Sequence, residues 1–163
     1  MKFFEDTQIG ETSGVGQHTF TAEDIKSFAA RFDPQPFHLD EEAAARSHFK
    51  KLCASGWHTV CVRMRLLVES KRREDEQSLA RGEPVGTLGP SPGFRDLKWL
   101  KPVRPGDTIS ARRTTLESRA SKSRPDIGIV NNLWEVFNQD GEMVMSMQGY
   151  GMFRRRNPGS STT

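Results

Sequence analysis

The chain has 163 residues, enough for one domain with its own core. Hydrophobic residues make up 34% and charged residues 28% of it. Few residues are thus available for a hydrophobic core, which favours completion of the core by a partner subunit. The net charge of +3 is small and the basic residues are spread along the chain, which argues against a nucleic-acid-binding surface.

Two cysteines, Cys53 and Cys61, lack the close spacing and the histidine companions of a zinc or redox motif. We therefore expect two reduced core thiols and no metal site. The sequence contains no apolar run of the length of a signal peptide or a membrane span. We expect a cytoplasmic protein that does not enter a membrane.

The first predicted elements are a short strand near residues 16–20 and a helix that follows it. Thr21 and Asp24 have the spacing of a capping box, and apolar residues recur on one helical face after it: Ile25, Phe28, Ala29 and Phe32. Pro34 ends the helix. Asp33 is thus expected just past a helix C-terminus, at the start of a loop.

The next segment runs from a carboxylate to an imidazole five residues later, as Asp33-Pro34-Gln35-Pro36-Phe37-His38. Each proline fixes its own φ and disfavours the α region for the residue before it, so Asp33 and Gln35 are expected to be extended. These restrictions limit the relative orientation of the Asp33 and His38 side chains. From spacing alone, a plain loop with an Asx turn and a solvated histidine is the simpler interpretation.

Two helix starts follow. Asp40 is placed to cap a short helix that has Glu41 and Glu42 in its first turn. After a polar connection, Ser55 is placed to cap a long helix. Gly56 then lies where an unpaired backbone N–H carries the positive end of the helix dipole and suits a carbonyl oxygen. Alternatively, Gly56 only permits close packing.

The long helix is strongly apolar in its first half. A helical spacing relates the apolar residues of one face: Trp57, Val60, Cys61, Met64, Leu67 and Val68. Val62 and Leu66 extend the apolar surface most of the way round, so we expect the whole helix to be buried here. From Glu69 a run of mixed charges predicts a solvated continuation of the helix. Residues 82–93, rich in glycine and proline, predict a long loop.

The rest of the chain predicts strands over residues 94–100, 108–117, 127–138 and 143–153, with turns at Pro105–Asp107 and at Asp140–Gly141. The tail from Arg154 has a disordered composition. The order of elements predicts an α+β fold, in which a curved antiparallel meander wraps around one long central helix.

At this point the residues resemble the MaoC-like dehydratases, which include the (R)-specific enoyl-CoA hydratases. The Asp33–His38 motif matches the family's Asp-x-Asn-Pro-x-His signature, and residues 54–58 and 97–107 match its central-helix start and its strand and turn. The likeness spans most of residues 10–153. It departs from the family at Gln35, where many relatives have Asn, and at Met64, where some have Ser.

The resemblance implies a hot-dog fold over residues 1–153 with a disordered tail at 154–163, a homodimer, and an acyl-CoA thioester as substrate, with CoA as its carrier and no other cofactor. It implies that Asp33 and His38 hold a water that adds across the 2,3 double bond. The N–H of Gly56 is implied to bind the thioester oxygen. Substrate contacts are expected from Gln35, Ser55, Trp57 and Met64.

The chemistry of these residue types agrees with a hydratase or dehydratase. An imidazole titrates near neutrality and serves as a base, a carboxylate orients the water, and a helix N-terminal amide stabilises an enolate oxygen. Two alternatives stay open on the same fold: an acyl-CoA thioesterase and a non-catalytic acyl-thioester-binding subunit. His58, next to Trp57, is expected to be structural.

Overall fold

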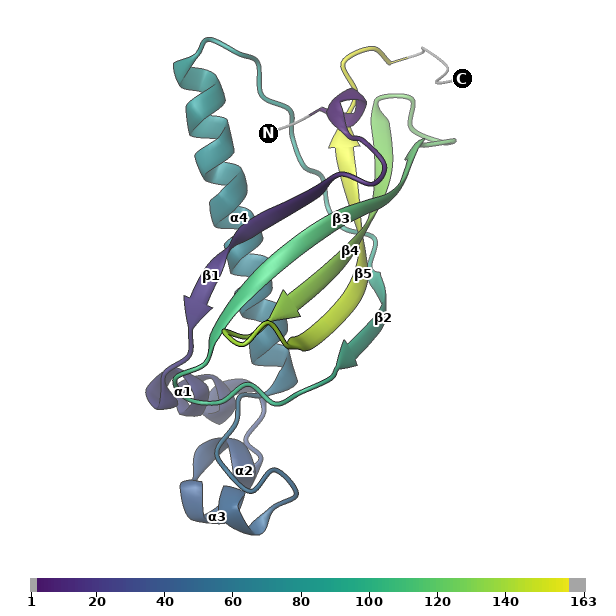
Figure 1. The fold of residues 1–163 in the computed structure, drawn as a ribbon. Helices are drawn as coiled ribbons and strands as arrows, with labels where there is room; N and C mark the ends of the chain where they lie inside the picture. Colours follow the sequence, from purple (N-terminus) through teal and green to yellow (C-terminus); the bar gives the residue numbers. More distant parts are fainter. Residues whose placement is uncertain (1–2, 159–163) are drawn as a thin grey trace.

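In the computed structural model, which describes residues 3–158, a long helix lies against one face of a five-stranded antiparallel sheet (Figure 1). This is the hot-dog fold that the resemblance implies. The elements are η1 (Phe4–Asp6), β1 (Thr12–Thr19), α1 (Ala22–Phe32), α2 (Pro36–Leu39), α3 (Glu41–Arg46), α4 (Gly56–Ala80), β2 (Phe94–Trp99), β3 (Thr108–Ala120), β4 (Ile127–Phe137) and β5 (Met143–Arg154).

The sheet has the strand order β1-β3-β4-β5-β2. The meander is confirmed for β3, β4 and β5, but β2 does not pair with β3 as a meander requires. It pairs with β5, from Phe94 opposite Gly149 to Trp99 opposite Met145. The turn at Pro105–Asp107 is therefore a link across the end of the sheet, held by a hydrogen bond of 2.8 Å from Gly106 N to Phe20 O.

The first strand is longer than predicted, because it begins at Thr12 and not at Gly16. Its glycines do not interrupt pairing with β3. They mark a bulge, where the register shifts between Gly14 and Gly16 and the φ of Gly16 is +135°. A bulge of this kind bends the strand and increases its twist.

The helix starts follow the capping chemistry of the sequence. Thr21 Oγ1 accepts a hydrogen bond of 3.0 Å from Asp24 N, and Asp40 Oδ1 accepts one of 2.8 Å from Ala43 N. Gln35 is extended as predicted, at φ −75° and ψ 139°. The segment is not a loop throughout, however, because Pro36 begins the four-residue helix α2. Proline is compatible with a first helical turn, since the N–H that it lacks has no partner there.

The predicted burial of α4 is wrong for four of the six residues on the face that runs from Trp57 to Val68. Trp57, Met64 and Val68 are 47%, 44% and 58% exposed, and Cys61 is exposed as well, so only one of the two cysteines is a core thiol. The residues of α4 that are buried are His58, Thr59, Val62, Arg63, Leu66, Leu67 and Lys71. The helix is apolar on two sides, and the sheet covers the side that carries Val62 and Leu66.

An exposed apolar surface is the consequence. It consists of the uncovered residues of α4 together with side chains of and next to β2: Trp57, Met64, Val68, Phe94, Trp99 and Leu100. We call this set the apolar stripe. Surface patches of this kind mark interaction sites in soluble proteins.

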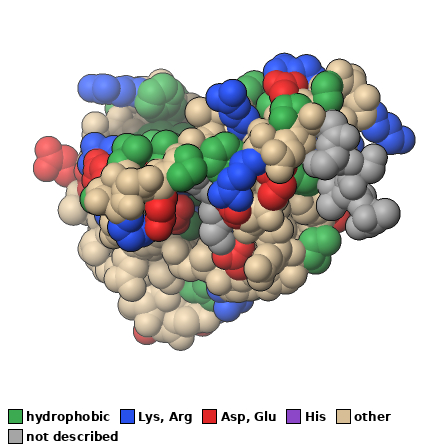
Figure 2. Space-filling model, turned by 90° about the horizontal axis from the view of Figure 1, so that it is seen from above, with side chains coloured by type: hydrophobic (Ala, Val, Ile, Leu, Met, Phe, Trp, Pro, Cys, Tyr) green, Lys and Arg blue, Asp and Glu red, His purple; other side chains and the backbone are tan. Residues whose placement is uncertain are grey.

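The far end of α4 leaves the core, as the charge run from Glu69 predicts, with the exception of Lys71, which is buried against the sheet side of the helix. Acidic and basic side chains are interspersed among hydrophobic ones on the face seen from above (Figure 2). Within residues 3–158, no helix is both long and apolar enough to cross a membrane.

The predicted tail from Arg154 is ordered in the part that the structure describes, residues 154–158. Arg154 belongs to β5, Arg155 N donates to Asp126 O at 2.9 Å, and Arg156 Nη2 donates to Asp6 Oδ2 at 2.8 Å. This part of the segment packs against η1 and the β3–β4 turn. Residues 159–163 lie outside the described residues.

Candidate active site

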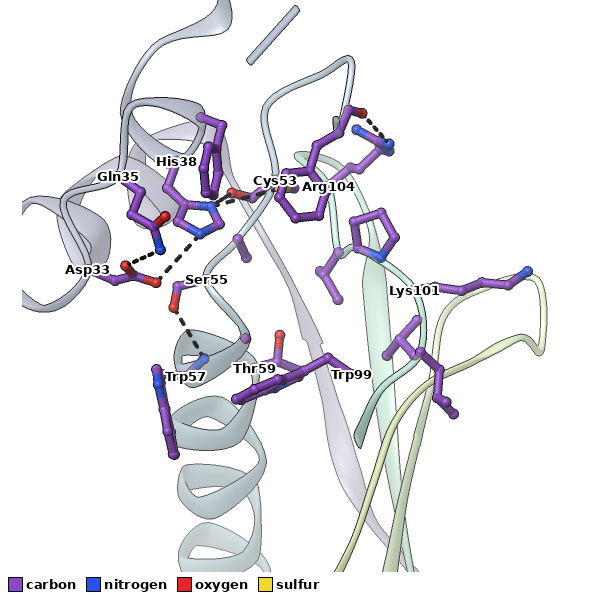
Figure 3. Close-up of a pocket in the computed structure, with 18 of the residues that line it drawn as sticks. Asp33, Gln35, His38, Cys53, Ser55, Trp57, Thr59, Trp99, Lys101 and Arg104 are labelled. Carbon is purple, nitrogen blue, oxygen red and sulfur yellow. Dashed lines mark hydrogen bonds and ion pairs between the residues drawn. The ribbon is translucent and has the colours of Figure 1, made fainter. Parts of the chain in front are cut away.

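A cavity of about 600 Å³ lies at the N-terminal end of α4. Its walls come from α2, the connection before α4, the first turn of α4 and the segment after β2 (Figure 3). The cavity brings together most of the site residues expected from the sequence: Asp33, Gln35, His38, Ser55, Gly56 and Trp57.

Asp33 and His38 face each other across one edge of this cavity. Asp33 is the C-cap of α1, and His38 lies in α2. The distance between Asp33 Oδ2 and His38 Nε2 is 3.5 Å, and the two side chains are 19% and 6% exposed. This separation is long for a direct hydrogen bond, and a water molecule can contact both atoms.

A backbone carbonyl orients the imidazole of His38. His38 Nδ1 lies 2.7 Å from Cys53 O, in the connection before α4. A carbonyl oxygen can only accept, so Nδ1 carries the proton and donates. In the neutral ring, Nε2 is then unprotonated and faces Asp33, which is the arrangement of a base.

Two polar side chains act on the Asp33 carboxylate. Gln35 Nε2 donates a hydrogen bond to Asp33 Oδ1 at 3.0 Å, and the Ser55 hydroxyl lies near the same carboxylate. Burial by itself raises the pKa of Asp33, but these two side chains and the nearby His38 lower the pKa below its ordinary value. Asp33 is therefore a carboxylate at neutral pH and acts as an acceptor.

Ser55 is fully buried and joins this carboxylate to the start of α4. Its Oγ accepts a hydrogen bond of 3.2 Å from Trp57 N, which confirms the predicted N-cap. The same hydroxyl lies near the Asp33 carboxylate and lowers its pKa. Ser55 thus links the start of α4 to the Asp33 side of the cavity.

Gly56 N–H, the first amide of α4, has no hydrogen-bond partner within residues 3–158 and lies at the positive end of the helix dipole. The glycine is also required by packing. A Cβ at this position would lie 2.4 Å from Trp99 Cε2. The two interpretations of Gly56 left open by the sequence are thus compatible, since Trp99 takes the space of the absent side chain.

Other cavity residues were not identified from the sequence. Trp99 packs edge-on against Trp57, with ring centroids 5.4 Å apart, and Thr59 is buried in the wall. Arg104 braces the connection before α4 by donating to Phe49 O at 3.0 Å, and Lys101 pairs with Glu142. The remaining lining residues include Phe37, His48, Phe49, Leu100, Pro102, Val103 and Val144. The strand pattern of residues 94–100 was the sole signal for Trp99.

Met64 does not lie with the other expected site residues. It lines a second cavity farther along α4. His58 is buried, stacks on Phe28 with ring centroids 4.4 Å apart, and packs edge-on against Phe20. Burial lowers the pKa of His58 to about 4, so it is neutral at physiological pH. This agrees with a structural histidine.

The comparisons with known proteins fit this geometry. Residues 6–135 match the family model described as the MaoC like domain. The chain is similar to a MaoC-like dehydratase from Rhodospirillum rubrum, with a TM-score of 0.80, 39% identity, and coverage of 96% of this chain and 99% of that one. It is 29% identical over 139 residues to the uncharacterized protein YdeM of Bacillus subtilis, covering 85% of this chain and 89% of YdeM.

A shorter similarity points to a named enzyme. Over 65 residues the chain is 35% identical to the mesaconyl-CoA hydratase of Cereibacter sphaeroides, covering 40% of this chain and 19% of that protein.

Ser55→Ala is expected to raise the pKa of Asp33, because it removes a hydroxyl that lowers this pKa, and to destabilise the fold by about 0.5–2 kcal/mol through the lost cap. A carboxylate whose pKa is lowered on folding stabilises the protein above its unfolded pKa and loses this effect as the pH falls through the folded pKa. Part of the cost of the variant should therefore disappear below about pH 4.

NMR titration of the Asp33 carboxyl and urea unfolding at several pH values measure the two effects. Ser70→Ala, half-buried on α4 and outside the first cavity, is the control and should leave the pKa of Asp33 unchanged. An unchanged pKa of Asp33 in Ser55→Ala would contradict the assigned effect of the Ser55 hydroxyl.

Proposed function

Because the chain belongs to the MaoC-like domain family, we propose that it is a hydratase or dehydratase acting on an acyl thioester. The reaction adds water to the 2,3 bond of an enoyl-CoA or a similar thioester, or removes water from the corresponding hydroxyacyl thioester. One observation carries the proposal. Asp33 Oδ2 and His38 Nε2 lie 3.5 Å apart on a cavity that also contains the unpaired N–H of Gly56.

The first step needs a held and activated water. The water binds between Asp33 and His38, donates to the carboxylate, and gives a proton to His38 Nε2 as its oxygen forms a bond to C3. The hydrogen bond of His38 Nδ1–H to Cys53 O keeps the ring in the tautomer that this transfer needs. Gln35 holds the Asp33 carboxylate in place.

The electron pair of the double bond moves towards the thioester as the C–O bond forms. The resulting enolate oxygen takes a hydrogen bond from Gly56 N–H at the positive end of α4. The protonated His38 Nε2 then gives its proton to C2, which completes the addition of water and restores the neutral imidazole, and the reverse sequence eliminates water. Trp57 and Trp99 form an aromatic wall beside this oxygen site.

We also infer that the protein is a homodimer in which the apolar stripe is the interface. The stripe leaves large apolar side chains of α4 and β2 in water, and a second copy presents the same side chains for an isologous contact. The interface covers the helix face that the sequence pattern marks as buried.

Val68→Glu is expected to convert a dimer to a monomer, because it places a charge in the apolar stripe, where Val68 is 58% exposed. Light scattering coupled to size exclusion measures the mass. Leu79→Glu, 60% exposed near the end of the same helix and outside the stripe, is the matched control and should leave two chains per particle. A wild-type mass of one chain at all concentrations would rule out the dimer.

Asp33→Asn and His38→Ala are each expected to lower the kcat/KM for hydration of a trans-2-enoyl-CoA by roughly 10²–10⁴-fold, because each removes one of the two groups that hold the water. Loss of the enoyl-thioester absorbance measures hydration, and mass spectrometry identifies the product. His18→Ala, a histidine outside the cavity, is the control and should retain activity.

The same assay separates the alternatives. Release of free CoA in place of a hydroxyacyl-CoA would indicate a thioesterase. Tight binding of enoyl-CoAs without any conversion would indicate a binding subunit. Full activity of both variants would refute the assignment of Asp33 and His38.

Gly56→Pro and Gly56→Ala separate the amide from the packing role of Gly56. Both variants place a Cβ against Trp99, but only proline removes the N–H, and proline is tolerated at the first position of a helix. Ser55 at φ −55° and ψ 141° already has the conformation that a following proline favours. We expect the kcat of Gly56→Pro to lie roughly 10²-fold or more below that of Gly56→Ala, measured by enoyl-CoA hydration. Equal kcat values in the two variants would show that the amide does not bind the reacting oxygen.

A further inference from the structure

Arg63 is a buried cation on the face of α4 that packs against the sheet. It is 3% exposed, its guanidinium carbon lies 4.6 Å from the centroid of the Trp134 ring, and Nη2 lies 3.4 Å from Met147 Sδ. Its Nε has no hydrogen-bond partner among the residues that the structure describes. An aromatic face and a thioether satisfy little of a group with five N–H donors.

No carboxylate of residues 3–158 forms an ion pair with Arg63. Burial lowers the pKa of Arg63 to about 10, so the guanidinium is still charged at neutral pH. A buried charge without a counter-ion destabilises a fold. Hydrophobic side chains of similar size pack at such a position without this cost, which points to a ligand as the missing partner.

The guanidinium lines the second cavity, which has a volume of about 330 Å³. Two more basic side chains line it: Lys71, which is 7% exposed, and Arg113, whose Nε is buried without a hydrogen-bond partner. No Asp or Glu lines this cavity, and most of its wall is apolar, including Leu67, Leu88 and Phe94. The cavity is thus suited to a ligand with an apolar body and an anionic end.

The two cavities follow each other along the same two walls. Helix α4 contributes Gly56 and Thr59 to the first cavity and Val60 and Arg63 to the second. The β2–β5 edge of the sheet does the same, with Trp99 and Val144 at the first cavity and Phe94 and Met147 at the second. Arg63 follows Gly56 by seven residues, about 10.5 Å along the helix axis.

We propose that Arg63 binds a carboxylate at the far end of the acyl chain, so that the preferred substrates are thioesters of dicarboxylic acids. The inference rests on the proposed function for the position of the thioester at Gly56. From there the acyl chain runs along α4, and its second carboxylate reaches the guanidinium. Arg63 is the group that distinguishes such a chain from that of a simple fatty acid.

Binding of saturated acyl-CoAs tests this without depending on turnover. Calorimetry compares the Kd of α,ω-dicarboxylic acyl-CoAs of six to ten carbons with that of the monocarboxylic acyl-CoAs of equal length. For at least one length, we expect wild type to bind the dicarboxylic ligand roughly tenfold or more tightly, the effect of one charge-assisted hydrogen-bonded pair. No preference at any length would overturn the inference.

Variants of Arg63 test whether this residue causes the preference for dicarboxylic acyl-CoAs. Arg63→Met should abolish it, and Arg63→Lys should retain part of it, since an ammonium is still a cation. Arg65→Met removes one positive charge from the exposed side of the same helix and should leave the preference intact. Retention of the full preference in Arg63→Met would also overturn the inference.

Stability and mass distinguish a ligand-binding role from a structural one. Arg63→Met should be as stable as wild type or more stable in urea, because it removes a buried unpaired charge, and should keep the wild-type mass. If the variant unfolded, or lost affinity for both classes of ligand together, Arg63 would be structural and the inference would be wrong.

Different outcomes would contradict the proposed function and the role of Arg63. Hydration of monocarboxylic enoyl-CoAs without a dicarboxylic preference would overturn this inference alone, whereas a dicarboxylic preference in binding without hydration of any enoyl-CoA would overturn the proposed function alone.

Discussion

The buried hydroxyl of Ser55 is the interaction on which the site depends. It caps α4 by accepting from Trp57 N, and it lies close enough to the Asp33 carboxylate at the end of α1 to lower the pKa of that carboxyl. The start of α4 and the end of α1 thus meet at the atoms where chemistry is proposed. A hydroxyl suits this position because such a group can donate and accept at once, which neither a carboxylate nor an ammonium can do.

The backbone at the start of α4 positions both the proposed base and the proposed oxyanion donor. Cys53 O, two residues before Ser55, sets the tautomer of His38, and Gly56, one residue after it, offers a free N–H. The base, the carboxylate and the oxyanion donor are all fixed to one short stretch of backbone. Such fixed positions reduce the reorganisation that a reaction requires.

Helix α4 combines three different uses along its length. Its first turn serves the first cavity, its middle presents Arg63 to the second cavity and carries Met64, which belongs both to that cavity and to the apolar stripe, and its charged end beyond Lys71 is largely solvated. A buried Arg63 without an anion and an exposed stripe of large apolar residues both destabilise an isolated, unliganded chain. Both are the expected marks of a surface that acts only with a ligand or a second copy.

The sequence by itself determined the features that depend on neighbours within a few residues. Caps at Thr21, Asp40 and Ser55 and the end of α1 before Pro34 were predicted, because local hydrogen bonds and steric limits fix them. The positions of β3 to β5 were also predicted, although β3 continues three residues further, to Ala120. The spacing of Asp33 and His38, together with the family resemblance, was enough to select the candidate pair. Only the tertiary structure decided which of the two apolar sides of α4 meets the sheet, that β2 pairs with β5, that Trp99 covers Gly56, and that Arg63 is buried without an anion. These outcomes depend on contacts between residues far apart in the chain, and the α4 pattern is compatible with burial of either side until the sheet covers one of them.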